Sequence, residues 1–168
     1  KTAPELVSVS NETLDVEGQS RTYTLALPKA LDPEKLLPLV VVLHGDGGDG
    51  PGMRTYHRFD AASGSEAVVV YPTGTGGGWN LHEPSSTNAD MKFVEALVPA
   101  LTAQHRIDPK RVFGVGYSAG GFFLNQLACR RDGFFRAIVT HAGGAPYEPD
   151  DAEASTWPSG ATRCRGQS

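Results

Sequence analysis

Several patterns are missing from this chain of 168 residues, and each absence excludes a class of protein. No apolar run approaches the roughly 20 residues of a membrane-spanning helix, and the apolar run at residues 39–43 has only the length of a strand. The net charge is −4, and basic residues do not cluster beyond Arg130 and Arg131, so we expect neither a membrane nor a nucleic acid as partner. The first residue is Lys1, without an initiator methionine or a signal-peptide pattern, and we therefore expect a mature or trimmed product.

Cysteine is scarce as well, with Cys129 and Cys164 as the only two in the chain. Cys129 falls in a predicted helix, whereas Cys164 falls in a tail rich in glycine, proline and serine that has little else to hold it. A disulfide between them would tie this tail to a rigid element, and two unrelated thiols are the alternative. We expect the disulfide, which forms in oxidising compartments and therefore predicts a secreted or periplasmic protein.

The remaining composition suits a single globular domain. Hydrophobic residues make up 39% and charged residues 20% of the sequence. A chain of this length can bury roughly 70% of the surface that it exposes when unfolded. We therefore expect one domain over residues 1–168, in which residues 145–168 form an irregular tail because they show no apolar periodicity.

Strand and helix patterns alternate along the chain. Residues 1–27 alternate loosely between apolar and polar side chains, with breaks at Gly18 and Pro28, which predicts antiparallel strands. Continuous apolar runs, typical of strands buried on both faces of a parallel sheet, and helical segments follow in turn. We expect strands at residues 39–43, 67–71, 112–115 and 137–140, and helices at residues 52–63, 88–104 and 119–131. This order predicts an α/β fold with a mostly parallel sheet, flanking helices and N-terminal antiparallel strands.

One stretch carries a catalytic pattern. Residues 116–120 spell G-Y-S-A-G between a predicted strand and a predicted helix, which is the G-x-S-x-G arrangement of a nucleophile elbow. In such an elbow the serine sits on a strained turn that lifts its hydroxyl above the sheet edge, and the glycines allow the strand and helix backbones to come close. Ser118 is therefore the candidate catalytic nucleophile. An ordinary glycine-rich turn is the alternative, because five such letters also arise by chance.

A second glycine-rich stretch, H-G-D-G-G-D-G at residues 44–50, follows a predicted buried strand. Its glycines match the dinucleotide fingerprint, but the next strand lacks the acidic residue at its end that would hold the ribose. Calcium binding through Asp46 and Asp49 lacks enough ligands at the right spacing. An oxyanion hole fits better, with backbone N–H groups from Asp46, or from Gly45 as second choice, and from Ala119. We expect no metal and no cofactor.

With these motifs the chain resembles the α/β-hydrolase superfamily, and within it the secreted esterases that include polyhydroxybutyrate depolymerases, feruloyl esterases and acetyl-xylan esterases. The resemblance covers residues 21–144 and rests on an ordered series of motifs. They are LPLVVVLHGDGG at 37–48, GWN at 78–80, NADMKFV at 88–94, HRIDPKRV at 105–112, GVGYSAGGFFLNQLAC at 114–129 and FRAI at 135–138 before a glycine pair. It implies a serine carboxylic-ester hydrolase that forms an acyl-enzyme on Ser118, acting on feruloyl, acetyl-polysaccharide or polyhydroxyalkanoate esters.

The same resemblance shows which catalytic groups are missing. In such enzymes an acid and then a histidine follow the serine, on loops after two further strands. His141 is the one histidine after the candidate nucleophile. It is a candidate base or substrate-binding residue, with Asp132 or Asp150 as an orienting acid. We favour instead a catalytic domain truncated after the strand at residues 137–140, which an acid and a histidine beyond Ser168 complete.

Two other positions near the predicted site have both a functional and a structural interpretation. Trp79 lies in the long glycine-rich loop of residues 72–88 and could stack on an acyl or sugar group, or anchor its own loop by packing. His44 is expected to form local hydrogen bonds that shape the oxyanion loop. A protein without the histidine and acid would be a non-catalytic binding module on the same fold, and dinucleotide binding is the third alternative.

Overall fold

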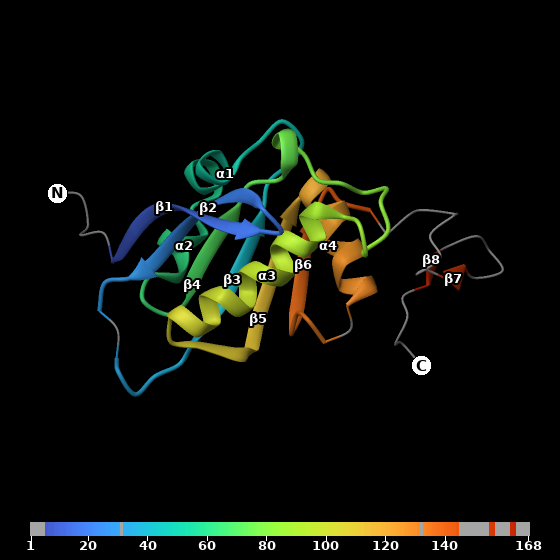
Figure 1. Cartoon of the computed structure of the whole chain (residues 1–168). Coiled ribbons are helices and arrows are strands. Elements are labelled where there is room, and N and C mark those ends of the chain that lie inside the picture. Colours follow the sequence, from blue (N-terminus) through green and yellow to red (C-terminus); the bar gives the residue numbers. More distant parts are fainter. Residues whose placement is uncertain (1–5, 31, 132, 145–154, 157–161, 164–168) are drawn as a thin grey trace.

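The computed structural model describes residues 6–30, 32–131, 133–144, 155–156 and 162–163. Within these ranges the chain forms a six-stranded sheet in the order β1-β2-β4-β3-β5-β6, and β7 and β8 form a second sheet (Figure 1). The strands are β1 Val7–Val16, β2 Gln19–Pro28, β3 Leu37–Leu43, β4 Val68–Pro72, β5 Ile107–Tyr117, β6 Ala137–His141, β7 Ser155–Thr156 and β8 Thr162–Arg163. The helices are α1 Gly50–His57, α2 Phe59–Ser63, the 3-10 helix η1 Thr75–Gly77, α3 Ala89–Gln104 and α4 Ala119–Arg130.

The large sheet is antiparallel on one side and parallel on the other, as the sequence pattern predicts. β1 and β2 form a hairpin, and β2 pairs antiparallel with β4, with Leu25 opposite Val70. β4, β3, β5 and β6 then pair in parallel, with Val40 opposite both Val69 and Phe113. Because parallel strands end at the same edge of a sheet, the carboxyl ends of β3 and β5 meet there. Both glycine-rich motifs follow these two strands.

Helices cover both faces of this sheet (Figure 1). α3 and α4 contact β5, and the larger apolar cluster holds Leu39, Val41 and Leu43 together with side chains of both helices. α1 contacts β2, β3 and β4, where a smaller cluster holds Val42 and Met53. Alternate residues of β3 thus enter opposite clusters, which explains why this strand is apolar throughout.

One predicted helix is wrong in its extent. The sequence pattern predicts a single helix over residues 52–63, whereas the structure has α1 and α2 separated by Arg58. Arg58 adopts the left-handed region with φ 42°, and its N–H donates to the Arg54 carbonyl at the end of α1. The buried Asp60 accepts hydrogen bonds from the Arg54 guanidinium and the Tyr71 hydroxyl. These contacts between elements hold α2 in its own direction, and the helical pattern does not reveal them.

Two further boundaries differ from the predictions. β5 begins at Ile107 rather than near residue 112, because Ile107 pairs with Leu37 before a register shift in the ladder with β3. β7 and β8 form short strands inside the segment predicted to be irregular. A two-residue strand is too short to show an alternation of apolar and polar residues, so the sequence pattern cannot predict it.

Some predictions concern positions outside the described residues. Asp132, Asp150 and Cys164 are among them, so the two candidate orienting acids and the disulfide with Cys129 stay predictions. Cys129 itself is buried near the end of α4. The extent of the domain over residues 1–168 also stays a prediction. Among the described helices, none is both long enough and apolar enough to cross a membrane.

Candidate active site

Ser118 occupies a sharp turn between β5 and α4, as the motif predicts. Its backbone has φ 50° and ψ −119°, a combination that costs energy for a residue with a side chain. The turn is held from two directions, because the Ser118 N–H donates to the His141 carbonyl at 2.9 Å and the Ser118 carbonyl accepts from the Gly121 N–H at 2.8 Å. The Ser118 hydroxyl caps no N–H group of α4. The helix therefore does not use this hydroxyl for its own stability.

The glycines of the motif allow the strand, the helix and the loop after β3 to meet. A Cβ atom added at Gly116 would lie 2.5 Å from the Gly120 carbonyl oxygen, and one added at Gly120 would lie 2.4 Å from the His44 carbonyl oxygen. Side-chain carbons do not approach backbone atoms this closely. Glycine is therefore required at both positions, and the residues after β3 lie directly beside the start of α4.

A single methyl group at Gly120 tests this packing. We expect Gly120→Ala to lower the free energy of unfolding by about 3 kcal/mol, because backbone rather than a flexible side chain would have to move. Gly121→Ala is the matched control, since the nearest atom to its added Cβ, the Gly143 Cα, would be 3.0 Å away. Its loss should be smaller, about 1 kcal/mol. Urea denaturation measures both variants, and equal losses would contradict the packing argument.

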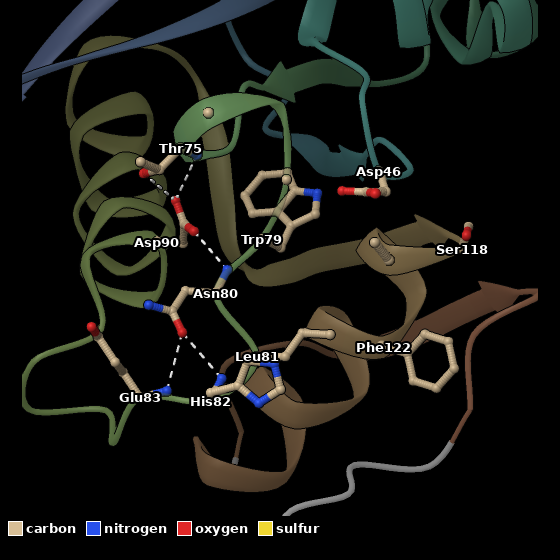
Figure 2. Close-up of a pocket in the computed structure, with 13 residues that line it drawn as sticks. Asp46, Thr75, Trp79, Asn80, Leu81, His82, Glu83, Asp90, Ser118 and Phe122 are labelled. Carbon is tan, nitrogen blue, oxygen red and sulfur yellow. Dashed lines mark hydrogen bonds between the residues drawn. The ribbon is translucent and has the colours of Figure 1, made fainter.

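The loop after β3 shares a cavity with the elbow (Figure 2). A Cβ atom at Gly45 would be 3.4 Å from the Ser118 Cβ. The next residue, Asp46, lines a cavity of about 750 Å³ together with Ser118 and Ala119. Neither the Asp46 N–H nor the Ala119 N–H has a hydrogen-bond acceptor among the described residues. The structure thus brings the three predicted catalytic positions to one cavity and leaves two backbone donors unused there.

His44 supports the glycine-rich loop through both ring nitrogens. The ring is buried, Nε2 accepts the Gly74 N–H at 3.0 Å, and Nδ1 lies 2.7 Å from the Gly45 carbonyl oxygen. These partners assign the neutral tautomer with hydrogen on Nδ1, because a proton on Nε2 would oppose the Gly74 N–H. Burial lowers the pKa of His44 below its ordinary value of 6.5, since the protonated ring would lose its solvation. The predicted local hydrogen bonds of His44 are confirmed.

Protein stability should therefore depend on pH through His44. The unfolded chain protonates this histidine as the pH falls below about 6.5, whereas the folded chain does so only at lower pH, so the unfolded state binds more protons in this window. We expect the free energy of unfolding to fall as the pH is lowered from about 7.5 to about 5.5, by at most about 1.4 kcal/mol per pH unit from this group. Denaturation at several pH values measures the slope. His44→Gln should lose this pH-dependent contribution to stability, whereas replacement of the exposed His57 by glutamine should keep it. Equal slopes in both variants would contradict the role of His44.

The opposite wall of the cavity is a loop held by a buried carboxylate. Asp90, in the first turn of α3, accepts hydrogen bonds from the Thr75 N–H at 3.1 Å, the Thr75 hydroxyl at 2.9 Å and the Asn80 N–H at 2.8 Å. The Arg21 guanidinium of β2 pairs with this carboxylate at 2.5 Å, and both side chains are buried. Figure 2 shows the Asp90 carboxylate between Thr75 and Asn80. Both ends of the segment that carries Trp79 are therefore attached to one side chain.

Trp79 has a packing role in this wall. Its side chain is 7% exposed, its Nε1 donates to the His44 carbonyl at 2.8 Å, and its ring stacks on Phe123 with centroids 4.9 Å apart. Trp79 also borders the cavity. The structure therefore supports the anchoring role that the sequence leaves open, and a contact of Trp79 with substrate stays a prediction.

His141 ends β6 opposite Tyr117, the residue that precedes the serine. The His141 ring is exposed and stacks on Tyr117, with centroids 5.5 Å apart, and it does not line the cavity. In the described part of the chain, no side chain forms a hydrogen bond with the Ser118 hydroxyl. The described residues thus provide a nucleophile position and two unused donors, but they do not bring a general base to the serine.

Several cavity residues have no role in the sequence predictions. Phe122, Leu81, His82 and Glu83 all border the cavity (Figure 2). Phe122 is 39% exposed and lies four residues after Ser118, so helical spacing from the elbow is a signal that could have found it. No group of three or more metal-ligating side chains occurs within the described ranges.

Known proteins resemble this chain in sequence. The model of the family described as esterase PHB depolymerase matches residues 21–156. The chain is 34% identical over 141 residues to NocK of Nocardia uniformis subsp. tsuyamanensis, which is described provisionally as an esterase, and 30% identical over 144 residues to feruloyl esterase C of Emericella nidulans. These alignments cover 80% and 82% of the chain but only 41% and 51% of the two relatives. The chain therefore spans about half the length of the curated relatives it matches.

Solved structures share the fold. The acetyl xylan esterase from Aspergillus awamori matches with a TM-score of 0.71 and 19% identity, and the match covers 92% of this chain and 57% of that one. A ferulic acid esterase matches with a TM-score of 0.63 and 22% identity, over 80% of this chain and 59% of that one. At these identities the likeness concerns the fold alone. The predicted α/β-hydrolase fold is confirmed.

Proposed function

This chain belongs to the esterase PHB depolymerase family, and from this we propose that it carries the nucleophile and the oxyanion hole of a serine carboxylic-ester hydrolase. One observation supports the proposal most. A serine on a strained turn, with a hydroxyl that its helix does not use, borders the same cavity as two backbone donors that have no acceptor among the described residues. Strain at a turn costs stability, and a catalytic role gives it a purpose.

In the proposed reaction the Ser118 Oγ attacks the ester carbonyl carbon, and its proton passes to a general base. The carbonyl oxygen becomes an oxyanion that accepts hydrogen bonds from the N–H groups of Asp46 and Ala119. Collapse of this intermediate breaks the bond to the alcohol oxygen, which takes up the proton and leaves an acyl-enzyme on Ser118. Water then attacks the acyl carbon in the same way and releases the acid. Close packing of the glycine-rich loop on the elbow holds these donors in place beforehand.

The general base is the part of this mechanism that the described residues do not supply. A serine hydroxyl without a base is a weak nucleophile near neutral pH. We propose that an acid and a histidine outside the described residues complete the catalytic domain, and the greater length of the curated relatives supports this. His141 is the alternative base, but among the described residues its ring stacks on Tyr117 and forms no hydrogen bond with Ser118.

Feruloyl, acetyl-polysaccharide or polyhydroxyalkanoate esters are the proposed substrates. The names of feruloyl esterase C and of the family model support the first and the last of these classes. A cavity of about 750 Å³ with Trp79, Leu81 and Phe122 at its border has room for an aromatic acyl group or a sugar ring. We further propose that the protein is secreted and that Cys129 forms a disulfide with Cys164.

A fluorophosphonate probe combined with an ester substrate tests the proposed function. We expect the full-length protein to hydrolyse p-nitrophenyl acetate and to bind the probe covalently, with the label on the peptide that contains Ser118 when the digest is examined by mass spectrometry. Hydrolysis with the label on a different residue would move the nucleophile elsewhere. Absence of both hydrolysis and labelling would favour a non-catalytic binding module on the same fold, since no described side chain activates Ser118.

A further inference from the structure

Asp46 brings a negative charge to the cavity in which the proposed reaction creates another one. Its N–H is a proposed oxyanion donor, while its carboxylate borders the same cavity and points toward Trp79 (Figure 2). Asp46 is exposed, so water and salt weaken its repulsion of a nearby negative charge but do not remove it at low ionic strength. A carboxylate at this position therefore opposes the reaction unless a group of the substrate offsets its charge.

Within the described part of the chain, nothing offsets this charge. No residue there donates a hydrogen bond to the Asp46 carboxylate or forms an ion pair with it, and no lysine or arginine lines the cavity. Two other acidic residues nearby do have partners: the Asp90 carboxylate pairs with Arg21, and the Asp49 carboxylate caps the start of α1. Gly78 lies beside the carboxylate, and a Cβ atom there would be 3.1 Å from the Asp46 Oδ1. The cavity thus contains an acceptor for which the described residues provide no partner.

We propose that Asp46 determines substrate specificity: its carboxylate accepts a hydrogen bond from a substrate hydroxyl close to the scissile ester, and it disfavours esters that carry a negative charge there. The inference rests on the proposed hydrolysis at Ser118 and adds the chemical class of the substrate. A hydrogen bond from a hydroxyl to a carboxylate is stronger than one between neutral groups and spreads the negative charge. Partly acylated sugars have such hydroxyls on the carbon next to the ester, and the free ends of hydroxyacid oligomers have them on the acyl chain.

Two matched variants of the full-length protein isolate the charge of Asp46. Asp46→Asn keeps the backbone N–H and the size of the side chain but removes the charge. Asp49→Asn removes one charge from the same loop, and asparagine can still cap α1 because it is as good a helix cap as aspartate. Ethyl acetate, 2-hydroxyethyl acetate and acetoxyacetate vary the alcohol half of the ester. Ethyl butanoate and ethyl 3-hydroxybutanoate vary the acyl half.

The measured quantity is the ratio of kcat/KM values between two esters of one series. We expect Asp46→Asn to lower the preference for the hydroxylated ester about tenfold in at least one series, and to raise the relative rate on acetoxyacetate about fivefold. Asp49→Asn should keep the native ratios. Raising the ionic strength from about 0.01 M to about 0.15 M should weaken the discrimination of the native protein against acetoxyacetate. The corresponding ratio of kcat/KM values in Asp46→Asn should stay unchanged. A merely structural role of Asp46 would change all esters alike and would not respond to salt.

Failure of this inference is distinguishable from failure of the proposed function. If no ester is hydrolysed in a way that depends on Ser118, the proposed function is wrong and the inference falls with it. If hydrolysis depends on Ser118 but the ratios of Asp46→Asn stay within about twofold of the native ones in both series, the inference about Asp46 is overturned alone.

Discussion

Replacement of Ser118 by alanine is expected to abolish ester hydrolysis and leave the fold intact. The value of kcat/KM should fall on the order of 10⁴-fold or more, because no acyl-enzyme can form and only the oxyanion donors remain. The folded state should change little, since alanine meets the same backbone strain at φ 50° and the lost hydroxyl caps no group of α4. Hydrolysis of p-nitrophenyl acetate and covalent labelling by the fluorophosphonate probe measure the effect.

Ser65→Ala is the matched control for this substitution. Ser65 lies in the turn before β4 and does not line the cavity, so its variant should keep the native rate and the label. Circular dichroism and urea denaturation should show that Ser118→Ala is folded. A folded Ser118→Ala protein that kept more than about one hundredth of the native rate would exclude Ser118 as the nucleophile.

Replacement of Asp90 by alanine is expected to cause the largest loss of stability. The free energy of unfolding should fall by about 4 kcal/mol, because the Arg21 guanidinium would stay buried without a counter-charge. Thr75 and Asn80 would also lose the acceptor of their N–H groups. The wall that carries Trp79 would then be attached through fewer contacts. Urea denaturation of the full-length protein measures this loss.

A more exposed ion pair, between the same helix and the turn that joins β1 and β2, provides the control. Lys92 pairs with Glu17 at 2.8 Å, but the two side chains are 28% and 67% exposed, so Lys92→Ala should cost less than about 1 kcal/mol. The double variant Arg21→Met with Asp90→Leu removes both buried charges and should recover part of the loss, because the uncompensated guanidinium is its main cause. Losses of equal size in Asp90→Ala and Lys92→Ala would show that the buried pair contributes no more than a surface pair.

The elbow and its neighbouring loop could be predicted from the sequence because their determinants are local. Gly116 and Gly120 flank Ser118, and a short apolar run on one side and a helical run on the other indicate the strand and the helix. The sequence also predicts that the ends of β3 and β5 lie close together, since parallel strands end at the same edge of a sheet. The motifs of the loop and of the elbow predict that Asp46 and Ala119 lie at one site.

The wall of the cavity could not be predicted in the same way. Arg21 lies on β2 and Asp90 on α3, 69 residues apart. The apolar pattern of each element predicts that element but does not indicate that the two side chains pair. The only signal is a charged residue at the start of a helix whose other buried positions are apolar, and a helix cap explains it equally well. The helix break at Arg58 could not be predicted from the local pattern either, because it depends on the contact of Asp60 with Tyr71 from β4.

Local residue order suffices to predict a serine on a strand–turn–helix elbow beside a glycine-rich loop, because backbone sterics at glycines act over a few neighbouring residues. The contacts of the side chains around that serine depend instead on tertiary packing. It buries Trp79 against His44, stacks the His141 ring on Tyr117 and gives the Asp46 carboxylate no partner among the side chains that the structure describes. Each of these depends on distances between elements that are far apart in the chain, and such distances follow from the packing of the whole sheet with its helices.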